Sequence, residues 1–125
     1  MTRDFTLSLV GAGGDGVVTM GDMLARAGAR EGLNAMKTDA YGPQIRGGES
    51  SSAVRLSPDP IYSQGDAVDV MVIFSWSGFA RFKSEIVPAE DAIIFHEATD
   101  PVPPEFKRGE RVAIVPVPFI ELAKA

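Results

Sequence analysis

Apolar residues recur along this chain in two rhythms, one typical of buried strands and one typical of a helix. Residues 5–10 are apolar at every second position and then continuously, which predicts a short buried strand. From Val17 to about Glu31 the apolar positions instead fall three and four residues apart, which predicts a helix. A second stripe of small residues runs beside them and includes Gly21 and Gly28. These small residues predict that the helix packs closely on a sheet.

The rest of the chain alternates between strand-like and loop-like segments. Further strands are expected at 34–38, 51–56, 69–74, 92–95 and 112–117, a short helix at 79–87, and a last helix from 119 to 125. Residues 39–49 are expected to form an inserted loop. Pro116 and Pro118 place the last strand near an edge of the sheet, because proline cannot donate to a strand ladder. The alternation predicts an α/β fold, a Rossmann-like three-layer domain with a mostly parallel sheet.

Composition narrows the classes of protein to consider. The chain has 125 residues, enough for the core of one domain, and its net charge of −5 argues against broad binding to nucleic acid or anionic membrane. No apolar run approaches the roughly 20 residues of a membrane span, and the first residues lack a signal pattern, so a cytoplasmic protein is expected. The absence of cysteine excludes a cysteine nucleophile and a cysteine-ligated iron–sulfur cluster within this chain.

Glycines are concentrated directly after the first predicted strand. Gly11, Gly13 and Gly16 match G-x-G-x-x-G between a strand and a helix, and Gly14 adds further room. The unpaired N–H groups at a helix N-terminus carry partial positive charge, so such a turn can hold a phosphate. Asp39 follows Gly16 by 23 residues, close to where dinucleotide-binding folds carry the acid that binds ribose. The same glycines would equally serve a tight turn with no ligand.

The most distinctive segment is Y-G-P-Q-I-R-G-G at 41–48. An arginine followed by two glycines, here Arg46, Gly47 and Gly48, can present a guanidinium and nearby backbone N–H groups together. That combination suits a phosphate or a carboxylate. The alternative is an ordinary surface loop in which Glu49 neutralises Arg46, and the residues alone leave both interpretations open.

Two further features follow predicted strands. His96 is the single histidine and comes directly after the strand at 92–95, but no nucleophile accompanies it, so a structural role is expected. Trp76 and Phe79 follow the strand at 69–74. They form either an apolar patch that faces a partner or a cover for the core, and the sequence leaves the two open.

These motifs, taken in their order, resemble the gamma subunit or domain of the 2-oxoacid:ferredoxin oxidoreductases, which include the pyruvate, 2-oxoglutarate and indolepyruvate enzymes. The resemblance rests on G-A-G-G-D-G-V-V at 11–18, L-A-R-A at 24–27, Y-G-P-Q-I-R-G-G at 41–48 and S-S-A-V-R-L at 51–56, and it continues past residue 69. Members of the family continue through another helix. The resemblance therefore predicts one gamma-type domain over residues 1–125, incomplete at its C-terminal end.

The resemblance also implies a function. The complete enzymes oxidatively decarboxylate a 2-oxoacid on thiamine diphosphate, reduce ferredoxin through iron–sulfur clusters, and release CO₂ and acyl-CoA. Thiamine diphosphate, Mg²⁺ and the clusters would lie on partner alpha and beta subunits or domains and a ferredoxin-like subunit. This chain would hold no catalytic residue or metal ligand and would assist assembly and the seating of coenzyme A. The residues implied in those contacts are Gly11, Gly13, Gly14, Gly16, Arg46, Gly47 and Gly48.

Two other functions stay open at this point. Gly11, Gly13, Gly16 and Asp39 are also compatible with a free-standing NAD- or FAD-binding oxidoreductase domain. A purely structural interaction module would use the same glycines for packing alone. Nucleotide binding by the chain itself would distinguish the first of these from the second.

Overall fold

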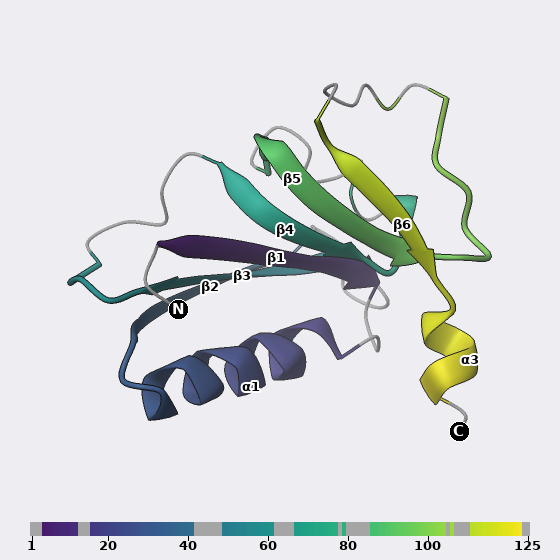
Figure 1. The fold of residues 1–125 in the computed structure, drawn as a ribbon. Coiled ribbons are helices and arrows are strands. Elements are labelled where there is room, and N and C mark those ends of the chain that lie inside the picture. The colour runs from purple at the N-terminus through teal and green to yellow at the C-terminus, as the bar shows by residue number, and fades with distance from the viewer. Residues whose placement is uncertain are drawn as a thin grey trace.

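The computed structural model of the chain describes residues 4–12, 16–41, 49–61, 67–77, 79, 86–104, 106 and 111–123. Within these ranges six strands form one sheet, in the spatial order β2-β3-β1-β4-β5-β6 (Figure 1). The strands are β1 (Phe5–Ala12), β2 (Asn34–Tyr41), β3 (Glu49–Ser57), β4 (Val68–Ile73), β5 (Pro88–Glu97) and β6 (Ala113–Val117). Two helices have described bounds, α1 (Val17–Arg30) and α3 (Phe119–Ala123), and no helix among the described residues is long and apolar enough to cross a lipid bilayer.

Strand direction confirms the predicted α/β fold with a mostly parallel sheet. β1, β4, β5 and β6 run parallel to one another, and β3 runs antiparallel between β1 and β2. α1 carries the chain from β1 past β3 to the far edge. β6 forms the opposite edge, as its proline Pro116 predicts. The insertion of β3 between β1 and β2 was not predicted.

The expected loop at 39–49 is shorter than predicted. Asp39 and Tyr41 continue β2, and Glu49 begins β3, because the two strands pair in register as far as Tyr41 opposite Ser50. The intervening residues 42–48 lie outside the described part of the chain. The inserted segment therefore begins and ends on paired strands.

The start of β5 also differs from the prediction. The strand begins at Pro88 rather than Ala92, and Val87 is not helical. The Val87 carbonyl accepts a hydrogen bond of 2.8 Å from the Val68 N–H, so this residue continues the pairing of β5 with β4. Residues 76, 77 and 79 are helical, so the helix begins before the predicted residue 79, and most of the helix predicted at 79–87 lies outside the described residues.

Connecting segments bury one face of the sheet. Trp76 lies at the centre of this cover, and its ring centroid is 5.7 Å from that of Phe79 and 5.0 Å from that of Phe106. These rings pack over apolar side chains of β1, β4 and β5, among them Met71 and Ile94, which are fully buried. Trp76 and Phe79 are therefore core residues, which decides between the two interpretations left open by the sequence.

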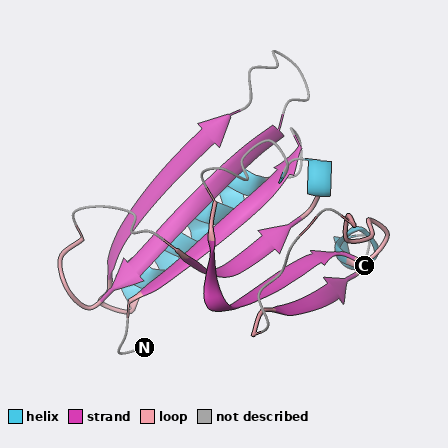
Figure 2. Cartoon of the chain, turned by 90° about the horizontal axis from the view of Figure 1, so that it is seen from above, coloured by secondary structure: helices cyan, strands magenta, loops and turns pink. Residues whose placement is uncertain are grey.

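α1 and α3 lie on the other face (Figure 1). Figure 2 shows α1 running along the strands behind the sheet. Gly21 and Gly28 bring this helix close to β3, because an added Cβ would clash with Ser52 at the first position and Leu56 at the second. This confirms the close packing predicted from the small stripe.

Candidate functional site

The glycine-rich turn after β1 and the segment between β2 and β3 leave the sheet at the same end of its strands. β1 ends at Ala12, which pairs with Glu49, the first residue of β3. β2 ends at Tyr41, opposite Ser50, so three neighbouring strands have their boundaries side by side. This end of the sheet holds the carboxyl ends of β1 and of its parallel neighbour β4. Open α/β sheets bind ligands at the carboxyl ends of their strands.

Two of the predicted site residues are described. Gly11 is buried in β1 opposite Ser50. Gly16 has a φ of 77°, a left-handed conformation that residues with a side chain rarely adopt. The other predicted site residues lie outside the described ranges and stay predictions: Gly13, Gly14, Arg46, Gly47 and Gly48.

The N-terminus of α1 provides donors at this edge. The Gly16 carbonyl accepts the first helical hydrogen bond, from Met20 N–H at 2.9 Å. Gly16 is the N-cap and has no side chain to cap the helix, and no acidic residue lies in the first turn. The N–H groups of Val17, Val18 and Thr19 therefore lack helical acceptors and carry the positive end of the helix dipole. This arrangement suits an anion.

The segment after β4 carries two hydroxyl groups that the sequence did not single out. The Phe74 N–H donates to the Val10 carbonyl at 2.8 Å, so the chain that follows β4 lies beside the end of β1. The Oγ atoms of Ser75 and Ser77 lie 2.7 Å apart on this exposed edge. The available signal was two serines directly after a buried strand.

The carboxylate of Asp39, near the end of β2, is bound by a lysine. Lys37 Nζ donates to Asp39 Oδ2 at 2.6 Å and lies 3.1 Å from Asp22 Oδ1 on α1. Burial lowers the pKa of Lys37, but the hydrogen bonds to Asp39 and Asp22 outweigh this effect and raise the pKa overall. Asp39 Oδ1 is buried without a hydrogen-bond partner in the described structure. Lys37 thus connects Asp39 on β2 to Asp22 on α1.

His96 has the structural role expected of it. It is buried at the end of β5, where Trp76 Nε1–H lies 3.3 Å from His96 Nδ1 and the Asp100 carbonyl lies 3.1 Å from the same nitrogen. The Trp76 backbone N–H donates to Asp100 Oδ2 at 2.8 Å. His96 therefore holds the aromatic core in place. No group of three His, Asp or Glu side chains that could hold a metal ion occurs among the described residues.

Glu97 connects β5 to α3. Its carboxylate accepts hydrogen bonds of 2.8 Å from the N–H and hydroxyl of Thr99, and one of 2.9 Å from the Ile120 N–H at the start of α3. The bond from the Thr99 N–H and then that from the Ile120 N–H hold the pKa of Glu97 below its ordinary value. The charged carboxylate therefore stabilises this junction.

Comparison with known proteins identifies the family. Residues 6–125 match the family described as pyruvate ferredoxin/flavodoxin oxidoreductase. The chain belongs to this family. It is 33% identical to ketoisovalerate oxidoreductase subunit VorA of Methanothermobacter marburgensis, over 98% of this chain and 25% of VorA. It is 30% identical to 2-oxoglutarate synthase subunit KorC of Methanocaldococcus jannaschii, over 98% of this chain and 64% of KorC. The chain thus spans only part of each relative.

Solved structures share the fold. The 2-oxoglutarate:ferredoxin oxidoreductase of Magnetococcus marinus, solved with 2-oxoglutarate, coenzyme A and succinyl-CoA bound, superposes on 99% of this chain with a TM-score of 0.83 and 29% identity. This match covers 21% of that chain. A keto/oxoacid ferredoxin oxidoreductase gamma subunit from Geobacter sulfurreducens gives a TM-score of 0.73 and 23% identity over 64% of its length. The family resemblance seen in the sequence is confirmed.

Proposed function

We propose that this chain works as the gamma-type domain of a 2-oxoacid:ferredoxin oxidoreductase. The complete enzyme would convert a 2-oxoacid, coenzyme A and oxidised ferredoxin to acyl-CoA, CO₂ and reduced ferredoxin. The family match and the relatives VorA and KorC, both named as subunits of 2-oxoacid-converting enzymes, support this assignment. These 125 residues contain no cysteine to ligate a cluster, so the redox centres would lie on other subunits or domains.

The role of the domain would be to seat coenzyme A and to hold the assembly together. The observation that carries this proposal is that the start of α1 lies at the same end of the sheet as the connection between β2 and β3. The N-terminus of α1, where Gly16 supplies no side-chain cap, lies beside the paired ends of β2 and β3, and the sequence places Arg46, Gly47 and Gly48 between these two strands. N–H groups without helical acceptors and an arginine suit the phosphates of coenzyme A. The coenzyme A in the Magnetococcus marinus structure supports this choice of ligand.

The remaining chemistry would belong to partners in the cytoplasm. Alpha and beta subunits would hold thiamine diphosphate with Mg²⁺, and a ferredoxin-like subunit would carry iron–sulfur clusters. Ferredoxin would be the electron acceptor. The relatives named as subunits support an assembly with partner subunits. In the proposed assembly the present chain would supply no reacting group.

The experiment is Arg46→Ala in the complete enzyme. Removing one charge-assisted contact to phosphate costs about 1.5–3 kcal/mol, so KM for coenzyme A should rise by about tenfold to a hundredfold. Arg111→Ala is the matched control, because Arg111 is exposed and precedes β6, the outermost strand on the side of the sheet away from β2 and β3. Unchanged assembly, rate and coenzyme A saturation in Arg46→Ala would remove the role assigned to this arginine.

The dinucleotide-binding alternative has weaker support. It needs a carboxylate at the end of β2 that can accept hydrogen bonds from a ribose. Lys37 engages one oxygen of Asp39 and the other is buried. Titration of the folded chain with NAD(H) and FAD tests this alternative directly, and tight binding would favour it over the gamma-domain role. A purely structural module would instead leave every kinetic constant unchanged when the glycine turn is substituted.

A further inference from the structure

Ser50 carries a hydroxyl group that forms no hydrogen bond within the described part of the chain. The residue is only 8% exposed, and its side chain has no partner among the described residues. It lies near the start of β3, where it pairs with Gly11 on one side and Tyr41 on the other. A nearly buried hydroxyl without a partner has given up hydrogen bonds to water, so a ligand that accepts its proton would stabilise it.

Ser50 lies beneath the first turn of α1. Side chains alternate along a strand, so Ser50 and Ser52 point to the same face. Ser52 points at the helix, because a Cβ added to Gly21 would clash with its hydroxyl, and Leu56 lies against Gly28 in the same way. The step along β3 from Leu56 to Ser52 therefore matches the step along α1 from Gly28 to Gly21. Continued on this scale, the step from Ser52 to Ser50 covers about one more turn and reaches the start of the helix.

The start of α1 supplies further donors at the same level. The N–H groups of Val17, Val18 and Thr19 lack helical acceptors, and Gly16 has no side chain to accept from them. Gly16 and Thr19 are exposed, so this end of the helix is open to solvent. Together with the Ser50 hydroxyl, these N–H groups form a set of donors in the corner between β3 and the first turn of α1. The helix dipole adds partial positive charge there.

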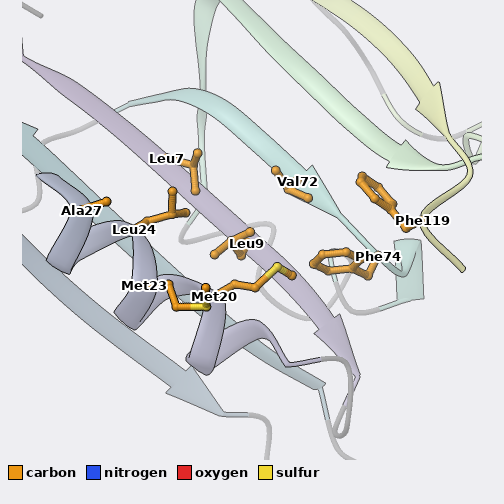
Figure 3. Close-up of a pocket in the computed structure, with 9 residues that line it drawn as sticks. All are labelled: Leu7, Leu9, Met20, Met23, Leu24, Ala27, Val72, Phe74 and Phe119. Carbon is orange, nitrogen blue, oxygen red and sulfur yellow. The ribbon is translucent and has the colours of Figure 1, made fainter. Parts of the chain in front are cut away.

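The side of this corner that faces β4 is apolar. Figure 3 shows Leu9 of β1, Met20 of α1 and Phe74 after β4 close together, where they line one groove. The Phe74 ring also packs against that of Phe119, with the ring centroids 4.9 Å apart. Gly11, two residues after Leu9, lies on the same face and has no side chain, so it leaves room beside these apolar groups. The donors described above therefore lie on the α1 side of the corner.

We propose that Ser50 and the first turn of α1 bind the terminal 3′-phosphate of coenzyme A, and that the Ser50 hydroxyl makes the domain selective for this group. A phosphate monoester has three free oxygens and a charge of about −2 near pH 7, so it can use several N–H donors and a hydroxyl in one corner. The diphosphate of coenzyme A continues into the molecule on both sides and would have to cross the apolar groups. This inference rests on the proposed seating of coenzyme A and assigns the phosphate that is bound.

The test is Ser50→Ala in the complete enzyme, with coenzyme A and 3′-dephospho-coenzyme A as alternative substrates. Loss of one hydrogen bond to a charged phosphate should raise KM for coenzyme A about tenfold. KM for 3′-dephospho-coenzyme A should stay the same, because this substrate lacks the group that Ser50 binds. Ser50→Cys keeps the shape of the side chain but is a weak donor, so it should give the same pattern. Ser52→Ala is the matched control and should change neither KM, because Ser52 lies on the same face but is fully buried under Gly21.

Two results would overturn the proposal. One is an unchanged KM for coenzyme A in Ser50→Ala, and the other is an equal rise in KM for both substrates, which would exclude the 3′-phosphate as the group bound. Arg46→Ala separates this failure from failure of the proposed function. If Arg46→Ala raises KM for coenzyme A and Ser50→Ala does not, only the assignment of Ser50 is wrong. If neither variant changes that KM, the seating of coenzyme A by this domain is wrong as well.

Discussion

The ammonium of Lys37 lies 2.6 Å from Asp39 Oδ2 on the same face of β2, and it also reaches Asp22 on α1. This contact engages the acid that the sequence offered as a ribose ligand. Asp39 instead helps to fix the helix that begins at the glycine turn. A partly buried cation between two carboxylates therefore helps to hold α1 against β2.

Replacing that cation should destabilise the domain. Lys37→Met leaves Asp39 partly buried without its partner, and the expected loss is about 1–3 kcal/mol of unfolding free energy. Because the folded pKa of Lys37 is raised, its contribution is complete below the ordinary lysine pKa of about 10.4 and is lost as pH rises through the folded value. Urea unfolding followed by fluorescence of Trp76, the single tryptophan, measures both effects.

The control for Lys37→Met is Arg26→Met. Arg26 is an exposed cation on α1 that forms no ion pair with the described residues, so its loss should change stability by less than about 0.5 kcal/mol. Equal stability of the Lys37→Met and Arg26→Met variants would show that the buried contact does not anchor α1.

Acid should weaken the junction between β5 and α3 through Glu97. Its folded pKa is lowered, so its contribution is present above the unfolded glutamate pKa of about 4.3 and is lost as pH falls through the folded value. Glu97→Gln should be less stable at neutral pH and should lose less stability across that acid window. Thermal unfolding from pH 7 to pH 3 measures the difference, with the exposed Glu90→Gln on the same strand as control. Parallel pH profiles for wild type and Glu97→Gln would contradict this role.

Close contact at Gly21 should reverse the usual effect of alanine in a helix. Alanine normally stabilises a helix interior by about 1 kcal/mol relative to glycine. At position 21 the added methyl would meet Ser52 and Lys37, and overpacking should cost about 1–3 kcal/mol. Urea unfolding of Gly21→Ala measures the result. Thr19→Ala, at an exposed position of the same helix, should be neutral or stabilising. A Gly21→Ala variant more stable than wild type would show that α1 does not pack as closely as described.

Local pattern was sufficient to predict β1, α1 and β4. Each has a continuous or periodic apolar signal and, for α1, a glycine-rich start, so neighbouring residues determine the element. The position of β3 could not be obtained in this way. Ser50, Ser51 and Ser52 indicate a strand, but its antiparallel insertion between β1 and β2 depends on pairing with β1, whose Ala12 is distant in sequence from its partner Glu49.

In the candidate site, too, local motifs could be predicted from the sequence, whereas contacts between separate strands could not. Gly11 and Gly16 were found because a short motif reports directly on local backbone geometry. Ser75 was not singled out, since its place beside the end of β1 follows from the parallel pairing of β1 with β4. The surroundings of Asp39 could not be predicted for a related reason. Its spacing from Gly16 fits a ribose ligand, but the sequence could not show that Lys37 would be its neighbour on the same face.

The most direct test of the gamma-domain assignment is to identify the proteins that co-purify with this chain. The chain is purified anaerobically from its native host with a mild tag, and the intact complex is weighed by mass spectrometry. We predict subunits that carry thiamine diphosphate and iron–sulfur clusters, in fixed stoichiometry with this chain. A folded chain that is recovered alone and binds a nicotinamide or flavin dinucleotide would contradict the assignment.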